Sequence, residues 1–191
     1  MGGYHRGVEL VLVHPQIPHN TGCAARLAAA LGLKLHLVEP LGFSLEDRYL
    51  KRAGLDYWPM VDLTVHKDWE TATACLSSGS QRPLAERLRL FSARGGDSLF
   101  RTDFAEDDLL VFGSESDGLP APLLAAYPQN RVYVPIREGV RSLNLANVVC
   151  LGAYTAMERA GLPLPDNAGG HVRHEAADSY PQPADIAKRP T

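Results

Sequence analysis

Residues 8–38 read VELVLVHPQIPHNTGCAARLAAALGLKLHLV, which places two short runs of Val and Leu on either side of a segment with helical spacing. The runs at 8–13 and 34–38 are largely apolar on both faces, as buried strands of a parallel sheet are. Residues 20–31 between them have the length and the small apolar side chains of a packed helix. A strand, a crossover helix and a second strand form the repeating unit of a parallel α/β sheet.

The same alternation continues to about residue 160. Further strands are expected at 87–92, 109–113 and 131–134, with a weaker candidate at 62–66, and further helices at 46–53, 68–76, 120–126 and 144–160. We therefore predict one α/β domain over residues 1–162, with a mainly parallel sheet and helices on both of its faces. Residues 163–191 contain five prolines and few large apolar side chains, which predicts a flexible Pro/Gly-rich tail.

Composition excludes several classes of protein. Of the 191 residues, 45% are apolar and 21% are charged, which is ordinary for a soluble domain and unlike a disordered or fibrous chain. The longest apolar run, 27–33, is far shorter than the roughly 20 residues that span a bilayer. The three widely spaced cysteines form neither a disulfide framework nor a zinc motif, so we expect no metal and a reduced, cytoplasmic compartment. The net charge of −3 means that any nucleic-acid partner requires a local basic patch.

Ligands of open α/β sheets bind beyond the carboxyl ends of the strands, and three loops in this position have unusual composition. The first, residues 14–26, contains two prolines, and Asn20 or Thr21 is placed to cap the following helix. Arg26 then falls about one turn into that helix, on the side of the capping loop. A capped helix with a solvated arginine explains the same residues without a ligand.

The second loop runs from the strand end at Gly113 to Pro120, which is placed to begin a helix. Gly113 and Gly118 allow a ligand to pack against the backbone, although a tight strand-to-helix connection would also require them. No Gly-Lys-Ser/Thr follows and no GxGxxG opens a helix, so neither a P-loop nor a nicotinamide site is indicated.

The third loop joins the last strand to the last helix over residues 134–147. Ser142 is a natural helix cap, and Asn144 and Asn147 are polar positions on an otherwise apolar helix. Buried amides are costly unless they are paired, so these two side chains either satisfy a tight turn or help to cradle a ligand.

The three loops contain, in order, Asn20-x-Gly22-x-x-x-Arg26, Gly113-x-Glu115-x-x-Gly118-Leu119 and Ser142-Leu143-Asn144-Leu145-Ala146-Asn147. Together they resemble the three motifs of the SPOUT-class RNA ribose 2′-O-methyltransferases. Three further stretches, at 15–22, 39–43 and 52–57, resemble one subfamily, the minimal tRNA (cytidine/uridine-2′-O)-methyltransferases of wobble position 34. The resemblance covers residues 8 to about 160. Ser114 and the Gly139-Val140 pair depart from the residues common in that subfamily.

The resemblance implies a fold, a cofactor and an assembly. The fold is an α/β sheet whose C-terminal part forms a deep trefoil knot, and the knot forms a pocket for S-adenosylmethionine. The chain is expected to act on tRNA as a homodimer, with each active site near the subunit interface. By motif position, the expected cofactor-binding residues are Ala93, Gly113, Glu115, Gly118, Val134, Ser142 and Leu143, and the expected substrate-binding residues are Asn20 and Arg141.

The resemblance also assigns catalytic candidates. Arg26 matches a residue beside the reacting 2′-oxygen, and an arginine stays charged under ordinary conditions. We expect it to hold the adjacent phosphate and stabilise the developing alkoxide, while phosphate or water takes the proton. Asn144 and Tyr154 are expected to orient the ribose or base, although Tyr154 also suits a helix packing seam.

Local positive charge is expected to hold the RNA. The candidate residues are Arg48, Lys51 and Arg52 on one short helix, Arg82, Arg87, Arg89, Arg94 and Arg101 around a strand, and Arg137 and Arg141 beside the third motif. Two rival hypotheses remain open: methylation of ribosomal RNA or of another tRNA position, and a non-catalytic RNA-binding module.

Overall fold

The computed structural model describes residues 7–45, 57–166 and 168, and its centre is one parallel sheet. The strand order is β3-β2-β1-β6-β4-β7-β5, and every neighbouring pair is parallel. The strands are β1 (Glu9–Val13), β2 (Lys34–Val38), β3 (Asp62–His66), β4 (Leu88–Phe91), β5 (Asp97–Ser98), β6 (Leu109–Phe112) and β7 (Arg131–Tyr133). The prediction of a mainly parallel sheet is therefore confirmed.

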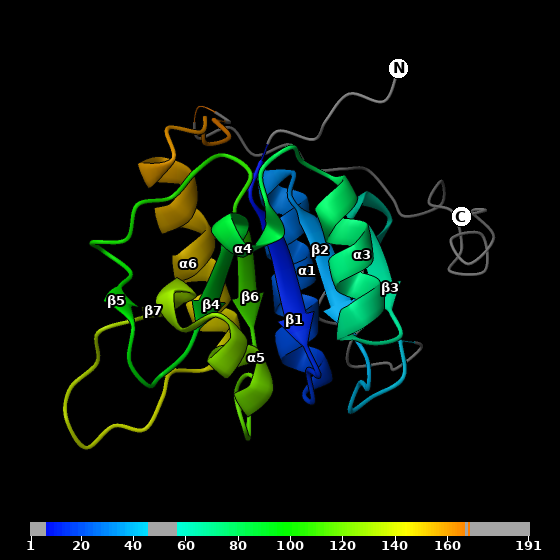
Figure 1. Cartoon of the computed structure of the whole chain (residues 1–191). Coiled ribbons are helices and arrows are strands. Elements are labelled where there is room, and N and C mark those ends of the chain that lie inside the picture. Colours follow the sequence, from blue (N-terminus) through cyan, green and yellow to red (C-terminus); the bar gives the residue numbers. More distant parts are fainter. Residues whose placement is uncertain (1–6, 46–56, 167, 169–191) are drawn as a thin grey trace.

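Helices cover both faces of this sheet (Figure 1), as predicted. They are α1 (Pro18–Leu31), α3 (Trp69–Ser78), α4 (Leu84–Arg87), α5 (Ala121–Ala126) and α6 (Leu145–Arg159), with short 3-10 turns η1 (Trp58–Met60) and η2 (Pro128–Asn130). In Figure 1, α1 and α6 lie behind the sheet and α3 and α5 lie in front. The helix predicted at 46–53 and most of the predicted tail lie outside the described residues.

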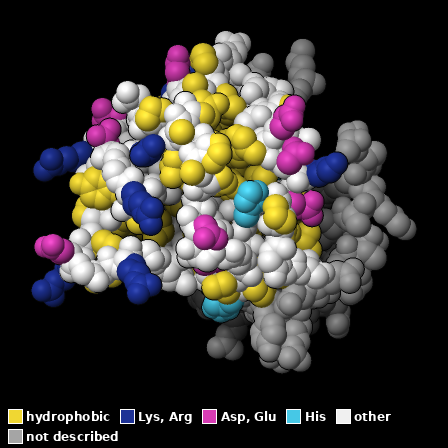
Figure 2. All heavy atoms as spheres, turned by 60° about the horizontal axis from the view of Figure 1, so that its bottom comes forward, with side chains coloured by type: hydrophobic (Ala, Val, Ile, Leu, Met, Phe, Trp, Pro, Cys, Tyr) yellow, Lys and Arg dark blue, Asp and Glu magenta, His cyan; other side chains and the backbone are white. Residues whose placement is uncertain are grey.

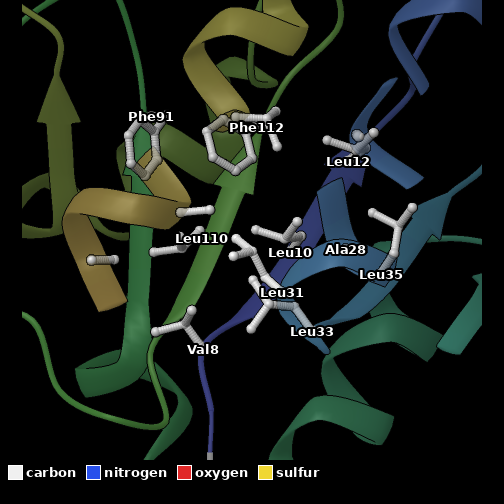
Figure 3. Close-up of a cluster of buried hydrophobic side chains, with 14 of the residues drawn as sticks. Val8, Leu10, Leu12, Ala28, Leu31, Leu33, Leu35, Phe91, Leu110 and Phe112 are labelled. Carbon is white, nitrogen blue, oxygen red and sulfur yellow. The ribbon is translucent and has the colours of Figure 1, made fainter. Parts of the chain in front are cut away.

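The alternation of side chains along each strand separates two hydrophobic cores. Leu10 and Leu12 of β1 face α1 and α6, whereas Val11 and Val13 face α3 and α5. Figure 3 shows the first core, where Leu10 and Leu35 of neighbouring strands gather around α1. Burial on both faces explains why the strands are continuous apolar runs and why they were recognisable from the sequence.

Helix α6 packs unusually close to the sheet. The rings of Phe91 and Phe112 stack with centroids 4.4 Å apart (Figure 3), and Gly152 of α6 lies directly over them. A β-carbon on Gly152 would stand 2.8 Å from the Phe91 ring, so only glycine permits this approach. The contact fixes the position of α6, and therefore of the loop that leads into it.

Two expectations about local structure were wrong or incomplete. Helix α1 begins at Pro18, so Asn20 and Thr21 lie inside its first turn instead of capping it. A proline suits that first position because it has no N–H that needs a cap. The two-residue strand β5 and the four-residue helix α4 were not predicted, since neither is long enough to produce a periodic pattern.

The strands and helices run in opposite directions, which gives the sheet a carboxyl edge and an amino edge. All the strands run toward one edge, the carboxyl edge, and α1 and α6 both start there and run back toward the amino edge. In Figure 1 the chain enters β1 and leaves α6 at the amino edge, away from the loops that carry the three motifs.

Candidate active site

Three of the connections at the carboxyl edge of the sheet carry one of the sequence motifs or lead into it. We call them loop 1 (residues 14–20, from β1 into the first turn of α1), loop 2 (113–120, β6 to α5) and loop 3 (134–144, β7 to α6). Strands β1 and β6 are neighbours, and only β4 separates β6 from β7. The loops are therefore close together in space although they are far apart in the sequence.

Glu115 ties loop 2 to loop 1 through three hydrogen bonds. Its carboxylate accepts from the backbone N–H of Gln16 at 2.8 Å, from that of Ile17 at 3.2 Å and from the side-chain amide of Asn20 at 2.9 Å. In return, the side-chain oxygen of Gln16 accepts from the backbone N–H of Ser116 at 3.3 Å. The backbone of loop 1 is thus held by an anion, and charge-assisted bonds of this kind are stronger than neutral ones.

Loop 2 presents Glu115 because its backbone turns back on itself. Ser114 and Gly118 exchange two backbone hydrogen bonds of 3.1 and 3.0 Å, which closes a tight turn around Glu115. A β-carbon on Gly113 would lie 2.0 Å from the backbone of Gly118, and Gly118 itself has a φ of +72°. Both glycines are therefore required by the turn itself, before any ligand is considered.

Asn144 ties loop 3 to loop 1. Its side-chain N–H donates to the side-chain oxygen of Asn20 at 2.9 Å, so one amide of Asn20 joins Glu115 to Asn144. The other end of the Asn144 side chain caps α6, accepting from the backbone N–H of Ala146 at 2.9 Å. The cap is therefore Asn144 and not Ser142 as predicted.

The exposure of the two motif-3 amides also differs from the expectation. Asn144 and Asn147 are both exposed, whereas burial was considered for them because the helix is otherwise apolar. The buried amide of this site is Asn20, which is only 3% exposed. Position at the first turn of a helix, where side chains reach unpaired backbone N–H groups, explains the asparagine at 144 better than burial does.

A second connection supports loop 1 from the other side. The backbone N–H of Gly42 donates to the carbonyl of Pro15 at 2.9 Å, and a β-carbon on Gly42 would stand 2.7 Å from the Cα of Gln16. Residues 39–43, which resemble the wobble-position subfamily, therefore pack against the backbone of loop 1 and support it. Its role as a support was not predicted, although the glycine was a visible signal.

Two predicted catalytic residues lie away from this network. Arg26 is exposed and sits six residues beyond Asn20, about 9 Å further along α1 and on a different face of it. Its guanidinium carbon lies 5.1 Å from the centre of the Tyr57 ring. Tyr154 is 43% exposed, roughly 15 Å along α6 from Asn144, beside Phe100 and Leu164. A single chain does not bring Arg26, Tyr154 and Asn144 together.

The remaining predicted residues lie on the loops of the carboxyl edge. Ala93 follows β4, Val134 follows β7, and Arg141, Ser142 and Leu143 lie on the exposed part of loop 3. Figure 2 turns this edge toward the viewer and shows Lys and Arg side chains gathered on the side where loop 3 and the β4–β5 connection lie. The exposed arginines of these segments are Arg94, Arg137 and Arg141.

Three other arginines expected to face RNA are used inside the protein. Arg87 is 1% exposed and donates to the carbonyl oxygens of Leu76 and Asp107. Arg82 and Arg89 form ion pairs with Asp108, whose carboxylate is fully buried and whose pKa is raised by that burial. All three lie at the amino edge of the sheet. Burial contradicts the expectation that Arg87 binds RNA, whereas RNA contact by Arg82 and Arg89, which are partly exposed, stays a prediction.

A buried polar chain crosses β1, β2 and β3 on the α3 face of the sheet. His36 contacts the Glu9 carboxylate through Nε2 at 2.8 Å and His66 through Nδ1 at 2.9 Å. Burial raises the pKa of Glu9, but the hydrogen bond and charge of His36 outweigh it and leave that pKa below its ordinary value. Burial lowers the pKa of His66, and His36 lowers it further. Sequence reasoning missed this chain because its three members lie in apolar strand runs.

Residues 7–45, 57–166 and 168 contain neither a metal-binding cluster nor a membrane-spanning helix. No group of three or more His, Cys, Asp or Glu side chains there is arranged to hold a metal ion. None of the helices in those ranges has the length and hydropathy needed to cross a membrane.

Comparison with known proteins agrees with this geometry. Residues 7–154 match the SpoU rRNA Methylase family, and the chain belongs to this family of RNA methyltransferases. It is 43% identical over 154 residues to the tRNA (cytidine(34)-2′-O)-methyltransferase of Burkholderia ambifaria, which covers 80% of this chain and 96% of the relative. The resemblance inferred from the three motifs is confirmed.

Solved structures give the same result. One that concerns the 2-OH methylation of C/U34 on tRNA is 46% identical, has a TM-score of 0.74 and covers 82% of this chain and 97% of that chain. An AdoMet-bound rRNA methyltransferase from Sinorhizobium meliloti has the same fold at 19% identity and a TM-score of 0.69, over 80% of this chain and 56% of that chain.

Proposed function

We propose that this protein methylates the ribose 2′-hydroxyl of nucleotide 34 in tRNA, with S-adenosylmethionine as the methyl donor. The observation that carries the proposal is the hydrogen-bonded path from Glu115 through Asn20 to Asn144, which joins all three motif loops at one edge of the sheet. Similarity to tRNA (cytidine(34)-2′-O)-methyltransferases over most of both chains supports the substrate and the position.

Loop 3 has the chemistry that the cofactor requires. Between residues 135 and 143, a fully described segment, the one backbone–backbone hydrogen bond joins Val140 to Arg137, so most N–H and C=O groups remain available to a ligand. Ile136, Val140 and Leu143 are exposed apolar side chains in the same segment. Free backbone groups beside apolar side chains suit a ligand with an adenine ring and an aliphatic arm.

We place the cofactor against the backbone of loops 2 and 3 and of the β4–β5 connection. The proposed contacts are Ala93, Gly113, Gly118, Val134, Ser142 and Leu143, as the motif positions imply. Both oxygens of Glu115 are occupied by loop 1, so Glu115 acts on this site by orienting the loops. When bound, S-adenosylmethionine supplies a methyl group that is already activated by the sulfonium charge.

The protein's own contribution is alignment and charge. Holding two reactants in line contributes roughly 7–11 kcal/mol to the barrier reduction. Asn144 and Asn20 hold the ribose side of the site, and Arg141 contacts the RNA backbone. Arg26 holds a phosphate through its planar fork and stabilises the oxygen that loses its proton to phosphate or water.

A second copy of the chain completes the site. Arg26 and Tyr154 lie on outward faces of α1 and α6, which start at the same edge and pack side by side, so the two residues stand at similar heights. Phe100, Tyr154 and Leu164 are 53%, 43% and 43% exposed, which leaves apolar surface beside them. In a homodimer formed through these faces, Arg26 and Tyr154 reach the partner's carboxyl edge.

Three further features belong to the same proposal. The C-terminal part forms a trefoil knot, supported by strand order: β7 lies between β4 and β5, and the chain then returns so that α6 packs over Phe91 and Phe112. An experimental trace of residues 92–145 without threading would contradict it. Residues 163–191 form a tail outside the domain 1–162, and the enzyme works in the cytoplasm.

The decisive experiment is nucleoside mass spectrometry of tRNA and of ribosomal RNA after incubation with the protein and S-adenosylmethionine. We expect 2′-O-methylated cytidine or uridine in tRNA, mapped to position 34 by fragment analysis. The variant Asn144→Ala should lose most of this product, whereas Asn147→Ala, an exposed amide in the same helical turn, should retain it. Product in ribosomal RNA alone would favour the ribosomal alternative, and cofactor binding without product would favour a binding module.

A further inference from the structure

Among the described residues, the Arg26 side chain has one specific contact, with the ring of Tyr57. It is exposed, and none of the hydrogen bonds or ion pairs among the described residues includes it. Its guanidinium carbon lies over the ring of Tyr57 at 5.1 Å from the centroid, within the range of a cation–π interaction. A free arginine at the surface has many rotamers, so this single contact selects where the charge points.

Tyr57 is itself firmly placed. The carbonyl of Tyr57 accepts from the backbone N–H of Met60 at 2.8 Å, and Tyr57 is the N-cap residue of the η1 turn. The next residue, Trp58, packs against the hydrophobic core between the sheet and helices α1 and α6, and η1 lies against α1. A tyrosine has few rotatable bonds, so its ring offers a fixed surface for a long, flexible partner.

An aromatic ring, unlike a carboxylate, can contact an arginine without occupying its N–H donors. A carboxylate would occupy the N–H edge of the guanidinium, and no carboxylate pairs with Arg26 among the described residues. An aromatic face contacts the guanidinium from above, and the N–H groups around its edge stay available. An arginine held in this way can still give two parallel hydrogen bonds to a phosphate.

We propose that Tyr57 is a positioning residue for the methyl-transfer reaction, which acts by stacking on Arg26 and keeping its N–H edge directed at an RNA phosphate. The inference rests on the proposed function, because it assumes that Arg26 takes part in the reaction. It adds a residue from outside the three motif loops, contributed by the segment that precedes β3.

The proposal predicts a contrast between two substitutions in the full-length protein. Tyr57→Phe keeps the ring and should keep kcat and the KM for tRNA near the wild-type values. Tyr57→Leu removes the ring and should lower kcat about two- to five-fold, as expected for loss of an exposed cation–π contact. The KM for S-adenosylmethionine should not change. Met60→Ala, an exposed residue of the same turn without a ring contact to Arg26, is the matched control.

A spectroscopic measurement tests the contact independently of activity. Ring currents of Tyr57 should shift the NMR signals of the Arg26 side chain, and the shift should persist in Tyr57→Phe and disappear in Tyr57→Leu. In an Arg26→Lys background, Tyr57→Leu should have less effect on kcat than in the wild type, because the planar group that stacks has already been removed.

Several outcomes would overturn the proposal. Unchanged kcat in Tyr57→Leu, with or without a lower Tm, would reduce the contact to a structural one. Loss of activity in Tyr57→Phe would assign the role to the hydroxyl group instead of the ring. An absent ring-current shift would show that the two side chains do not stack. A wild-type protein without methyl transfer to any RNA would contradict the proposed function, and the NMR measurement would still decide whether Tyr57 orients Arg26.

Discussion

The side-chain amide of Asn144 donates a hydrogen bond of 2.9 Å to the side-chain oxygen of Asn20, although 124 positions of sequence separate the two residues. Asn20 simultaneously donates to Glu115 and is buried, so its rotamer is fixed from both sides. The same Asn144 side chain caps α6. The side-chain amide of Asn20 therefore links loops 1, 2 and 3 and fixes their relative positions.

Removing the Glu115 carboxylate should loosen loop 1. Glu115→Ala leaves three donors without their acceptor, and we expect a loss of about 1–3 kcal/mol in the free energy of unfolding together with at least tenfold lower kcat. Glu115→Gln should have stability and kcat between those of the wild type and of Glu115→Ala, because an amide offers one acceptor oxygen. Urea unfolding and methyl-transfer kinetics measure both effects. Glu106→Ala, an exposed carboxylate elsewhere, is the control, and equal behaviour of the two alanine variants would refute the role of Glu115.

The two glycines of loop 2 should respond differently to alanine. At Gly113 a β-carbon would overlap backbone atoms of residues 118 and 119, so Gly113→Ala should destabilise the fold by about 3 kcal/mol or more. At Gly118 the space is open and only the positive φ opposes a side chain, which costs about 1–2 kcal/mol. Chemical denaturation of the two variants gives the ranking. A larger loss at Gly118 than at Gly113 would be inconsistent with this turn.

The buried chain Glu9–His36–His66 should make stability depend on pH. The pKa of His66 is lower in the folded than in the unfolded protein, so below about pH 6.5 the unfolded chain binds a proton that the folded chain does not. The pKa of Glu9 is also lowered, which adds a loss of stability below about pH 4.5. The free energy of unfolding should therefore fall on acidification, first through His66 and then through Glu9.

Urea unfolding between pH 8 and pH 4 checks this dependence. The variant His66→Phe should show a shallower decrease than the wild type between pH 7 and pH 5. At neutral pH, His36→Ala should cost about 3–5 kcal/mol, because it leaves the buried Glu9 carboxylate without its partner. Identical pH profiles for the wild type and His66→Phe would remove His66 from the explanation.

Replacing Arg26 by lysine tests the planar fork. Arg26→Lys retains the charge but loses the bidentate geometry, and we expect kcat to fall about tenfold with little change in stability, since the side chain is exposed. Steady-state kinetics and thermal unfolding separate the two quantities. Full activity in this variant would argue against a bidentate phosphate contact.

Loop 3 should contribute to RNA binding through charge. Arg141→Ala should weaken tRNA binding and reduce the dependence of log K on log salt concentration by about 0.7–0.9, the value for one lost phosphate contact. Arg159→Ala is the comparison, because Arg159 is not among the RNA candidates and donates instead to the carbonyl oxygens of Phe100 and Thr102. Binding titrations at several salt concentrations measure the slopes, and equal slopes for both variants would exclude a phosphate contact at Arg141.

The parallel sheet was predictable because its strands are buried on both faces. The limits of β2 and β3 match the prediction, whereas β5 has two residues and gives no periodic signal. Convergence of the three motif loops was also predictable, since parallel strands end at one edge. The individual contacts were not predictable. The sequence does not indicate that Asn20 bridges Glu115 and Asn144, or that Asn144 caps α6.

Charged residues were the hardest to place from the sequence. Arg87 and Arg94 are arginines at opposite ends of β4. Arg87 is 1% exposed, whereas Arg94 lies on an exposed loop. Burial of Arg87 depends on carbonyl oxygens supplied by α3 and by the residues before β6, contacts between distant segments. The same long-range pairing conceals Glu9, His36 and His66 within apolar runs.

The chain enters β1 and leaves α6 at the amino edge, whereas the three motif loops lie at the carboxyl edge (Figure 1). A label attached close to the start of β1 or to the last turn of α6 would therefore lie on the side opposite the loops where we propose that methyl transfer takes place. Protein held at those positions should keep the proposed RNA-facing edge open to solution, which makes this fold suitable for single-molecule observation of substrate capture.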